Sequence, residues 1–421
     1  MSSVKGKILK TSTDVNEFNG VWLKKENQYS REELIKCADS FMGLIPGISD
    51  ILFYYSLLPI VTTFLEKVRS YPDFILVLTG RRGNFKTTLA RMVVLVLKQE
   101  ELQELKFFRT PSLNLIEERM NALVGMNLLI DDIFPASGQY QRAKQSDLLN
   151  QLSRFGDKRL YKAGLIITAE RMPEQLILSG RDRIFQLSIP DMCSDRKMKL
   201  WNECKKIPED FMACLAESLK KCLSERSDEV IGDITQFIQQ YKLPEGLTME
   251  TRIGVHAEYI ELTEFLYRKY FCNEKRECQI MEQFTGRLYA TSIRQHNEIC
   301  KAEFEQELNY VLEVYQMMTA ENRYLKMEGH YNDYKPKGNN FLIWNGRYYI
   351  TSEALQYGMQ IYLKHTVSLK KISRALCDAG VLETNSGDAR TKKCGLGVRH
   401  YVISRYAIEM YCSETVGVKS T

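Results

Sequence analysis

The chain has 421 residues, of which 44% are hydrophobic and 26% charged, and its formal net charge is +5. This composition is that of an ordinary globular protein and excludes an intrinsically disordered chain. The length predicts two to four domains. The longest nearly apolar run, Ile51–Leu65, contains Pro59 and is shorter than a bilayer span, so we expect no membrane segment.

Eleven cysteines and five histidines are scattered along the chain without the spacing of a metal site or a disulfide framework. Cys272 and Cys278 are six residues apart, but no second pair of ligands stands near them. The first ten residues include lysines, and no apolar export signal follows them. We therefore expect reduced thiols, a cytoplasmic protein and no metal ion other than one carried by a nucleotide.

Strands and helices are predicted to alternate in the first half of the chain. A short helix near Arg31–Ser40 and a buried helix at Ile51–Arg69 come first. Short apolar runs bounded by turn residues then predict strands, and helical segments are expected at residues 86–100 and 142–159. This alternation favours an α/β fold with a parallel sheet. The predicted strands are Phe74–Leu78, Asn127–Asp131, Gly164–Thr168 and Arg183–Ile189.

The second half has a different pattern. Long amphipathic helices are expected from about Cys193 to Tyr331, followed by a linker at Tyr334–Asn340. A strand at residues 347–351, helices beginning at Ser352 and Ser368, a glycine-rich basic loop and a strand at residues 399–404 complete the chain. Two helices followed by a hairpin are typical of a winged-helix domain.

The stretch LTGRRGNFKTT after the first predicted strand almost matches the phosphate-binding pattern G-x-x-x-x-G-K-[ST]. In such a loop, backbone amides hold the phosphates, the lysine reaches the β and γ phosphates, and the hydroxyl binds Mg²⁺. Phe85 replaces the second glycine, which leaves an active site, a damaged one or a chance match as alternatives. The expected nucleotide contacts are Gly80, Arg81, Arg82, Gly83, Asn84, Phe85, Lys86, Thr87 and Thr88.

An acidic pair ends the second strand in LLIDDI. Asp131 is expected to order Mg²⁺ with Thr87, and Asp132 to activate the attacking water. The alternative is a strand that ends in two solvated aspartates. An apolar strand, a lysine-containing loop and a helix upstream favour an ATPase that uses ATP and Mg²⁺.

Polar residues near the next two strands are further candidates. Thr168 is expected at the sensor position beside the acidic strand, where it contacts the γ-phosphate or the water. Glu170 either assists or caps the following turn. Arg181 and Arg183 precede the fourth strand. Each is either the arginine that stabilises the transition state, often from a neighbouring subunit, or a salt-bridged structural arginine.

Five segments stand in order between the acidic pair and the fourth strand: DDIFP at 131–135, RFGD at 154–157, KAGLIITAE at 162–170, Pro173 and SGRDR at 179–183. Together with the loop, they resemble the motifs of the AAA+-type helicase-like ATPases of phages, plasmids and integrative elements. The resemblance implies a ring-forming ATPase, with a hexamer favoured, that moves or loads on DNA during replication of a mobile element. It also implies a separate primase as a possible partner, and the roles above for Lys86, Thr87, Asp131, Asp132, Thr168 and Arg183. Phe85 and Ala169 depart from the usual glycines.

Positive charge is concentrated near the C-terminus, where residues 364–405 contain nine Lys or Arg and three Asp or Glu. Because neutralisation of phosphates supplies most non-specific affinity, we expect this segment to contact DNA. A solvated basic face and a winged helix that binds protein are the alternatives. The expected DNA-contacting residues are Lys370, Lys371, Arg374, Arg390, Lys392, Lys393 and Arg399.

The prediction is therefore an N-terminal extension (1–48), a P-loop ATPase core (49–192), a helical, lid-like domain (193–334) and a winged-helix domain (335–421). The leading hypothesis is an oligomeric DNA motor. Its loop Ala136–Lys144 either lines a pore through Arg142 and Lys144 or is an ordinary surface loop. The rival is a regulatory or defence-type switch ATPase whose C-terminal module binds DNA or a protein. A degenerate ATPase is a third alternative.

Overall fold

The computed structural model describes the chain in two compact units, Met1–Ile299 and Cys300–Thr421, and each is considered by itself. The boundaries of the four predicted domains remain predictions. The described residues are 29–97, 102–106, 111–133, 139–154, 163–172, 178–248, 251–272, 278–320, 324–326, 341–344, 346–363, 368–378, 382–383, 392–394 and 398–404.

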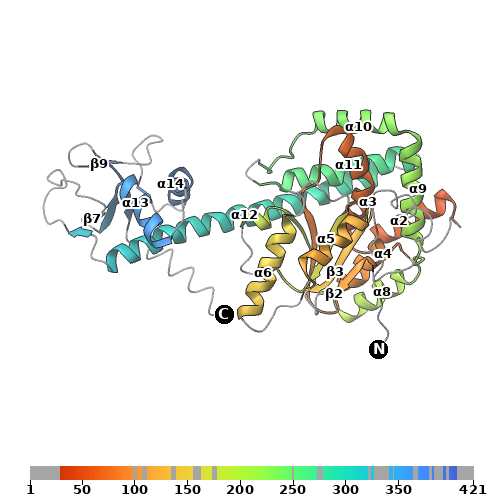
Figure 1. Ribbon diagram of the computed structural model, residues 1–421, viewed down its shortest axis with the longest axis horizontal. Helices are drawn as coiled ribbons and strands as arrows, with labels where there is room; N and C mark the ends of the chain where they lie inside the picture. The colour runs from red at the N-terminus through yellow and green to blue at the C-terminus, as the bar shows by residue number, and fades with distance from the viewer. Residues whose placement is uncertain are drawn as a thin grey trace. The chain divides into compact units, whose positions relative to one another are not determined.

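A five-stranded parallel sheet forms the centre of the first unit (Figure 1). Its order is β2-β3-β4-β1-β5, so β4 lies between β1 and β3. The predicted parallel α/β sheet is confirmed. Sequence reasoning missed β2, because its three residues include no apolar run. The strands are β1 (Ile75–Thr79), β2 (Glu104–Lys106), β3 (Asn127–Ile133), β4 (Gly164–Ala169) and β5 (Ile184–Ser188).

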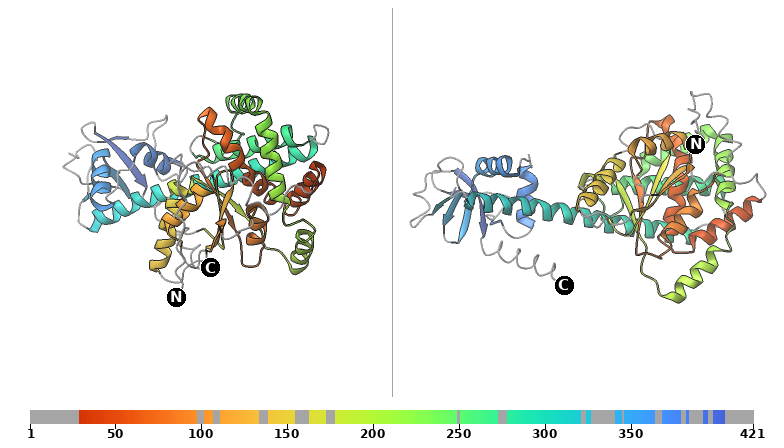
Figure 2. Two further views of the ribbon diagram at one scale, coloured as in Figure 1. Left: turned by 45° about the vertical axis from the view of Figure 1, so that its right-hand side comes forward. Right: turned by 60° about the horizontal axis from the view of Figure 1, so that its bottom comes forward.

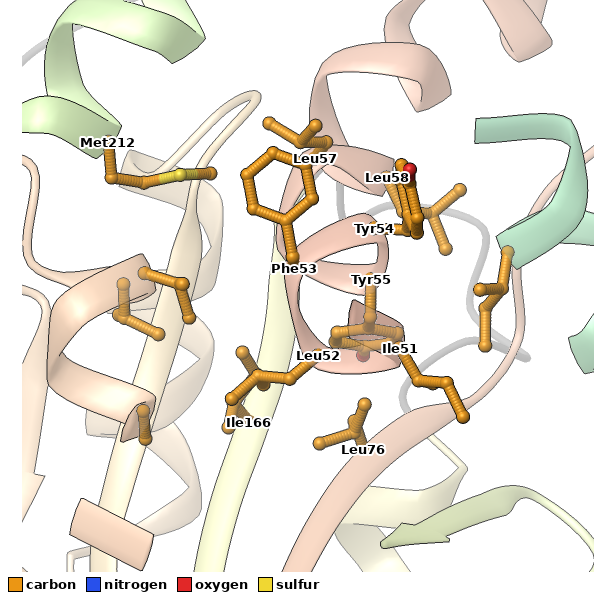
Figure 3. Close-up of a cluster of buried hydrophobic side chains, with 14 of the residues drawn as sticks. Ile51, Leu52, Phe53, Tyr54, Tyr55, Leu57, Leu58, Leu76, Ile166 and Met212 are labelled. Atoms are coloured by element: carbon orange, nitrogen blue, oxygen red, sulfur yellow. The ribbon is translucent and has the colours of Figure 1, made fainter. Parts of the chain in front are cut away.

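Helix α3 (Ser49–Leu65), continued by the 3-10 turn η2 (Glu66–Val68), is buried on nearly all sides. In Figure 3 its Phe53 points towards Met212, while Ile51 and Leu52 lie near Ile166 and Leu76 of the sheet. Within the described residues, Ser49–Val68 is the one helix long and apolar enough to cross a membrane. Its burial against the sheet accounts for that composition, since a core helix needs apolar residues on every face.

Helix α4 (Lys86–Val94) begins at the lysine of the P-loop candidate and ends earlier than predicted. The expected helix to residue 100 is wrong, because Leu95 leaves the helical conformation. The buried side chain of Gln103 accepts hydrogen bonds from the N–H groups of Val96 and Leu97 and donates to the carbonyl of Val94. These bonds satisfy backbone groups that a longer helix would have paired.

Most of the remaining helices of the first unit share one hydrophobic core with the sheet. Helix α2 carries a capping box at Ser30 and Glu33, and its Phe41 contacts Phe211 of α9. Helix α11 packs against α3 (Figure 1). The bounds are α2 (Arg31–Met42), α5 (Leu113–Ala122), α6 (Gln139–Ser153), α7 (Leu178–Arg181), α8 (Ser194–Cys204), α9 (Phe211–Glu225), α10 (Ser227–Gln240) and α11 (Ile253–Phe271).

The second unit has its own sheet, drawn in blue in Figure 2, and its own hydrophobic core. The strand order is β6-β7-β8-β10-β9, and every pair except β6–β7 is antiparallel. The helices predicted at Ser352 and Ser368 are present, whereas the expected linker and most of the basic loop lie outside the described residues. The elements are α12 (Cys278–Ala320, shared with the first unit), β6 (Tyr324–Lys326), β7 (Phe341–Trp344), β8 (Arg347–Ile350), α13 (Ser352–Gly358), the π-helix η8 (Met359–Leu363), α14 (Leu369–Asp378), β9 (Lys392–Cys394) and β10 (Val398–Ser404).

Candidate nucleotide-binding site

The segment between β1 and α4 has the backbone shape of a phosphate-binding loop. Gly80 has φ 151°, and a Cβ there would lie 3.0 Å from the carbonyl oxygen of Ile189, so the position favours glycine. Gly83 also lies in the left-handed region, with φ 76°. Because α4 begins at Lys86, the loop ends at a helix N-terminus, where unpaired N–H groups favour anions.

Phe85 takes the left-handed conformation itself, with φ 67° and ψ 8°. This is the position at which the sequence lacks the expected glycine. The ring is half-buried, packs against the hydrophobic core and lies 6.4 Å from the ring of Trp201 on α8. The substitution therefore changes how the loop is held while its backbone keeps the shape that glycine would allow.

Lys86 is buried, and its Nζ donates to the carbonyl oxygens of Gly80 (2.6 Å) and Arg81 (3.0 Å). Burial lowers the pKa of Lys86, and the carboxylates of Glu170, Asp132 and Asp131 act in the opposite direction. The ammonium group thus lies inside the curve of the loop, where an anion would supply further acceptors. Of the other loop residues, Arg81 and Arg82 are exposed and Thr88 is half-buried.

Asp131 joins three elements at the carboxyl end of the sheet. Thr87 on α4 and Thr168 on β4 each donate a hydroxyl hydrogen bond to its Oδ1, both at 2.7 Å. The Thr168 hydroxyl also accepts the backbone N–H of Asp132 at 2.8 Å. The tertiary structure thus brings together the P-loop hydroxyl, the acidic strand and the predicted sensor residue.

The two aspartates lie at an irregularity of β3. The register against β4 shifts between Ile130 and Ile133, and Asp132 has φ 64°. A bulge of this kind turns side chains away from strict alternation. At this irregularity Asp131 is buried and the neighbouring Asp132 is exposed.

Two further contacts of the site were not predicted. Arg91 on α4 makes a bidentate pair with Glu104 on β2 (2.9 and 2.5 Å), and its Nη2 lies 3.6 Å from Oδ2 of Asp131. The Asn84 side-chain amide donates to Oδ1 of Asp191 at 3.0 Å, and Arg81 pairs with the same carboxylate at 3.1 Å. Neither contact has a sequence signal, because the partners come from separate segments.

Arg181 and Arg183 are not part of this cluster. They precede Ile184, which pairs with Ile75 at the amino end of β1, whereas the loop follows Thr79 at the carboxyl end. Both arginines are half-buried. Within one chain they therefore lie at the amino ends of the strands, whereas the P-loop candidate lies at the carboxyl ends.

The predicted pore loop is partly helical. Residues 136–138 lie outside the described residues, and α6 begins at Gln139, so the expectation of a loop reaching Lys144 is wrong. Arg142 and Lys144 are in the first turns of α6. Of the motif segments, Phe134, Pro135, residues 155–157, Lys162 and Pro173 also lie outside the described residues.

The predicted DNA-contacting residues belong to the second unit. Lys370, Lys371 and Arg374 are exposed on α14, whose Ile372 and Leu376 are buried in the unit's core. Arg399 on β10 is exposed and pairs in register with Lys393 of β9, which also contains Lys392, and Arg390 lies outside the described residues.

The residues at the carboxyl end of the sheet fit a magnesium–nucleotide complex. The Thr87 hydroxyl and the Asp131 carboxylate already share a hydrogen bond, and both are hard oxygen ligands of the kind that Mg²⁺ prefers. Lys86 and the helix N-terminus supply positive charge beside them.

No protein-family model and no curated protein matches the chain. A solved structure described as "SCCmec type IV Cch - active helicase" is similar with a TM-score of 0.53 and 13% sequence identity, covering 97% of this chain and 75% of that one. The apo structure of the NrS-1 C terminal region (305-718) has a TM-score of 0.29 and 12% identity, covering 94% of this chain and 79% of that one. The first likeness shows a shared fold.

Proposed function

We propose that this chain is an ATP-hydrolysing DNA motor of the helicase or helicase-loader type. The observation that carries the proposal is the pair of hydrogen bonds from Thr87 and Thr168 to Asp131. They join the P-loop helix to two strands that are adjacent in the sheet but distant in sequence. The fold shared with a structure described as an active helicase supports the same interpretation.

In this proposal Lys86 and the amides of Gly80–Thr88 bind the phosphates, and Thr87 and Asp131 hold Mg²⁺. The metal would neutralise charge that develops on the transferred phosphoryl group. Asp132, exposed next to this pair, orients and deprotonates the attacking water. Thr168 fixes Asp131 and the Asp132 amide, and so holds the two carboxylates in their different positions.

The arginine that completes the site would come from a second copy of the chain. Arg181 and Arg183 precede β5, at the amino ends of the strands. The P-loop candidate follows β1, whose five residues span roughly 16 Å from that end to the loop. An arginine supplied in trans requires an oligomer, and a hexameric ring is the form that we propose. This arrangement would make hydrolysis depend on contact between neighbouring subunits.

DNA would bind to the second unit, which we propose to be a winged-helix domain. The succession of α13, α14 and the antiparallel pair β9–β10 supports this interpretation. Exposed basic residues on α14 and Arg399 on β10 supply charge for phosphate contacts. Replication of a mobile element, with a separate primase, is the process that we propose from the motif resemblance.

The test is steady-state ATP hydrolysis by the full chain with no DNA, single-stranded DNA and double-stranded DNA. We expect DNA to stimulate turnover, and we expect Lys86→Ala and Asp132→Asn to abolish it. Lys199→Ala, which removes an exposed charge on α8, is the matched control and should behave as the wild type. Tight ATP binding without stimulation by either DNA would contradict the motor and leave the switch ATPase.

A further inference from the structure

The backbone of Phe85 is in a conformation that its side chain disfavours. With φ 67°, the residue is in the left-handed region, where a Cβ crowds the following carbonyl oxygen. A bulky residue stays there only when surrounding contacts over-determine the conformation. The P-loop candidate therefore needs a compensating contact that a loop with glycine at this position would not need.

Trp201 supplies such a contact from α8. The two rings are 6.4 Å apart between centroids and inclined by 49°, within the range of favourable aromatic pairs. Lys205, the C-cap residue of α8, places its Nζ 4.8 Å from the centroid of the Trp201 ring. The aromatic pair is thus continued by a cation–π contact that helps to fix the indole.

Residues 190–201, which include Trp201, also contact other parts of the loop. The Asn84 amide donates to the carbonyl oxygen of Pro190 and to the Asp191 carboxylate, which also pairs with Arg81. Residues 190–201 therefore contact the loop at three of its positions. Yet Trp201 itself is 42% exposed, which is unusual for an aromatic residue that serves only to fill a core.

We propose that Trp201 is a positioning residue: by packing on Phe85 it holds the left-handed backbone that the P-loop requires. The inference rests on the proposed nucleotide binding at this loop. Trp201 would then raise nucleotide affinity without touching the nucleotide, because it keeps the loop amides in their binding arrangement. Glycine at position 85 would make this contact unnecessary.

The experiment is a double-mutant cycle on the full chain, with the dissociation constant of Mg·ADP as the readout. Trp201→Ala should weaken binding roughly three- to tenfold when residue 85 is phenylalanine, the range expected for one aromatic pair. In the Phe85→Gly background the same change should have almost no effect. Met198→Ala, at an exposed position one turn earlier on α8, is the matched control and should not weaken binding.

Equal losses in both backgrounds would overturn the proposal, because Trp201 would then support the fold alone. No loss in either background would overturn it as well. If the wild type binds no Mg·ADP, the proposed function fails. Thermal unfolding of the wild type, Trp201→Ala, Phe85→Gly and the double variant then tests the contact by itself. Trp201→Ala should lower the unfolding temperature less when Phe85→Gly is also present, and an equal decrease would contradict the inference.

Discussion

Thr168 donates a hydrogen bond to Asp131 across the junction of β4 and β3, at 2.7 Å. The same hydroxyl accepts the Asp132 N–H, so one side chain is bonded to both members of the acidic pair. The irregular register of β3 makes this possible, because it brings consecutive residues to different positions around one oxygen.

Replacing Thr168 by valine should reduce turnover far more than nucleotide binding. The change removes the hydrogen bond to the Asp131 carboxylate and the one accepted from the Asp132 N–H. The bond to the carboxylate alone is worth about 1.5–3 kcal/mol, which corresponds to roughly a 10- to 100-fold lower kcat. Steady-state hydrolysis and the Mg·ADP dissociation constant should be measured together. Thr168→Ser keeps the hydroxyl and should retain most of the activity, and similar losses in the two variants would contradict the role given to Thr168.

Arg181 and Arg183 allow a test of sharing between subunits. If one of them acts in trans, inactive Lys86→Ala and inactive Arg183→Ala chains should regain activity when mixed, because some interfaces then combine an intact loop with an intact arginine. The same mixture should be made with Arg181→Ala. ATP turnover against mixing ratio is the measurement, and strict additivity for both arginines would argue against an arginine in trans.

The basic face of α14 should determine how DNA affinity depends on salt. Affinity for DNA falls as salt rises, so a plot of the logarithm of the binding constant against the logarithm of salt concentration has a negative slope. Replacing Lys370, Lys371 and Arg374 together should make this slope less steep by about one for each phosphate that these side chains neutralise. Lys220→Ala with Lys221→Ala removes exposed charge from α9 in the first unit and is the comparison. Fluorescence anisotropy at several salt concentrations gives the slope for each protein. If the α14 triple variant has the same slope as the wild type, DNA binding by α14 is contradicted.

His256 should make stability depend on pH. The ring is fully buried and stacks on Phe74 at 4.2 Å, and burial, assisted by the Arg252 charge, lowers the pKa of His256 to about 3. The folded state keeps the ring neutral, whereas the unfolded chain binds a proton below about pH 6.5. Stability from this residue is therefore present above pH 6.5 and is lost as the pH falls towards 3.

The loss amounts to about 1.4 kcal/mol per pH unit, or about 2 kcal/mol at pH 5. Burial raises the pKa of Glu258 and Glu264 to about 7, which opposes this trend in the wild type. The comparison with His256→Leu isolates the histidine, because both proteins keep the glutamates. Urea unfolding at pH 7.5 and pH 5 is the measurement, and parallel pH dependences would contradict a neutral buried ring.

The sequence alone predicted most of the first unit's sheet and the residues of its candidate site. Continuous apolar runs marked β1, β3 and β4, because strands covered on both faces need no polar alternation. The mixed run RIFQLSI at residues 183–189 marked β5. Lys86, Thr87 and the acidic pair followed from short motifs whose chemistry depends on neighbouring positions. Their roles in catalysis remain predictions.

Tertiary structure decided the contacts between separate segments. Strand β2 forms beside β3 without an apolar pattern, and only there does Glu104 meet Arg91. Helix α4 stops at Val94 because Gln103 folds back onto the chain. Sequence marked Phe85 as a departure from the loop pattern, but only the fold shows Trp201 against its ring. Local sequence patterns reflect the backbone preferences and the burial of neighbouring residues. Contacts between residues far apart in the sequence, such as Phe85 and Trp201, depend on how the helices and strands pack together.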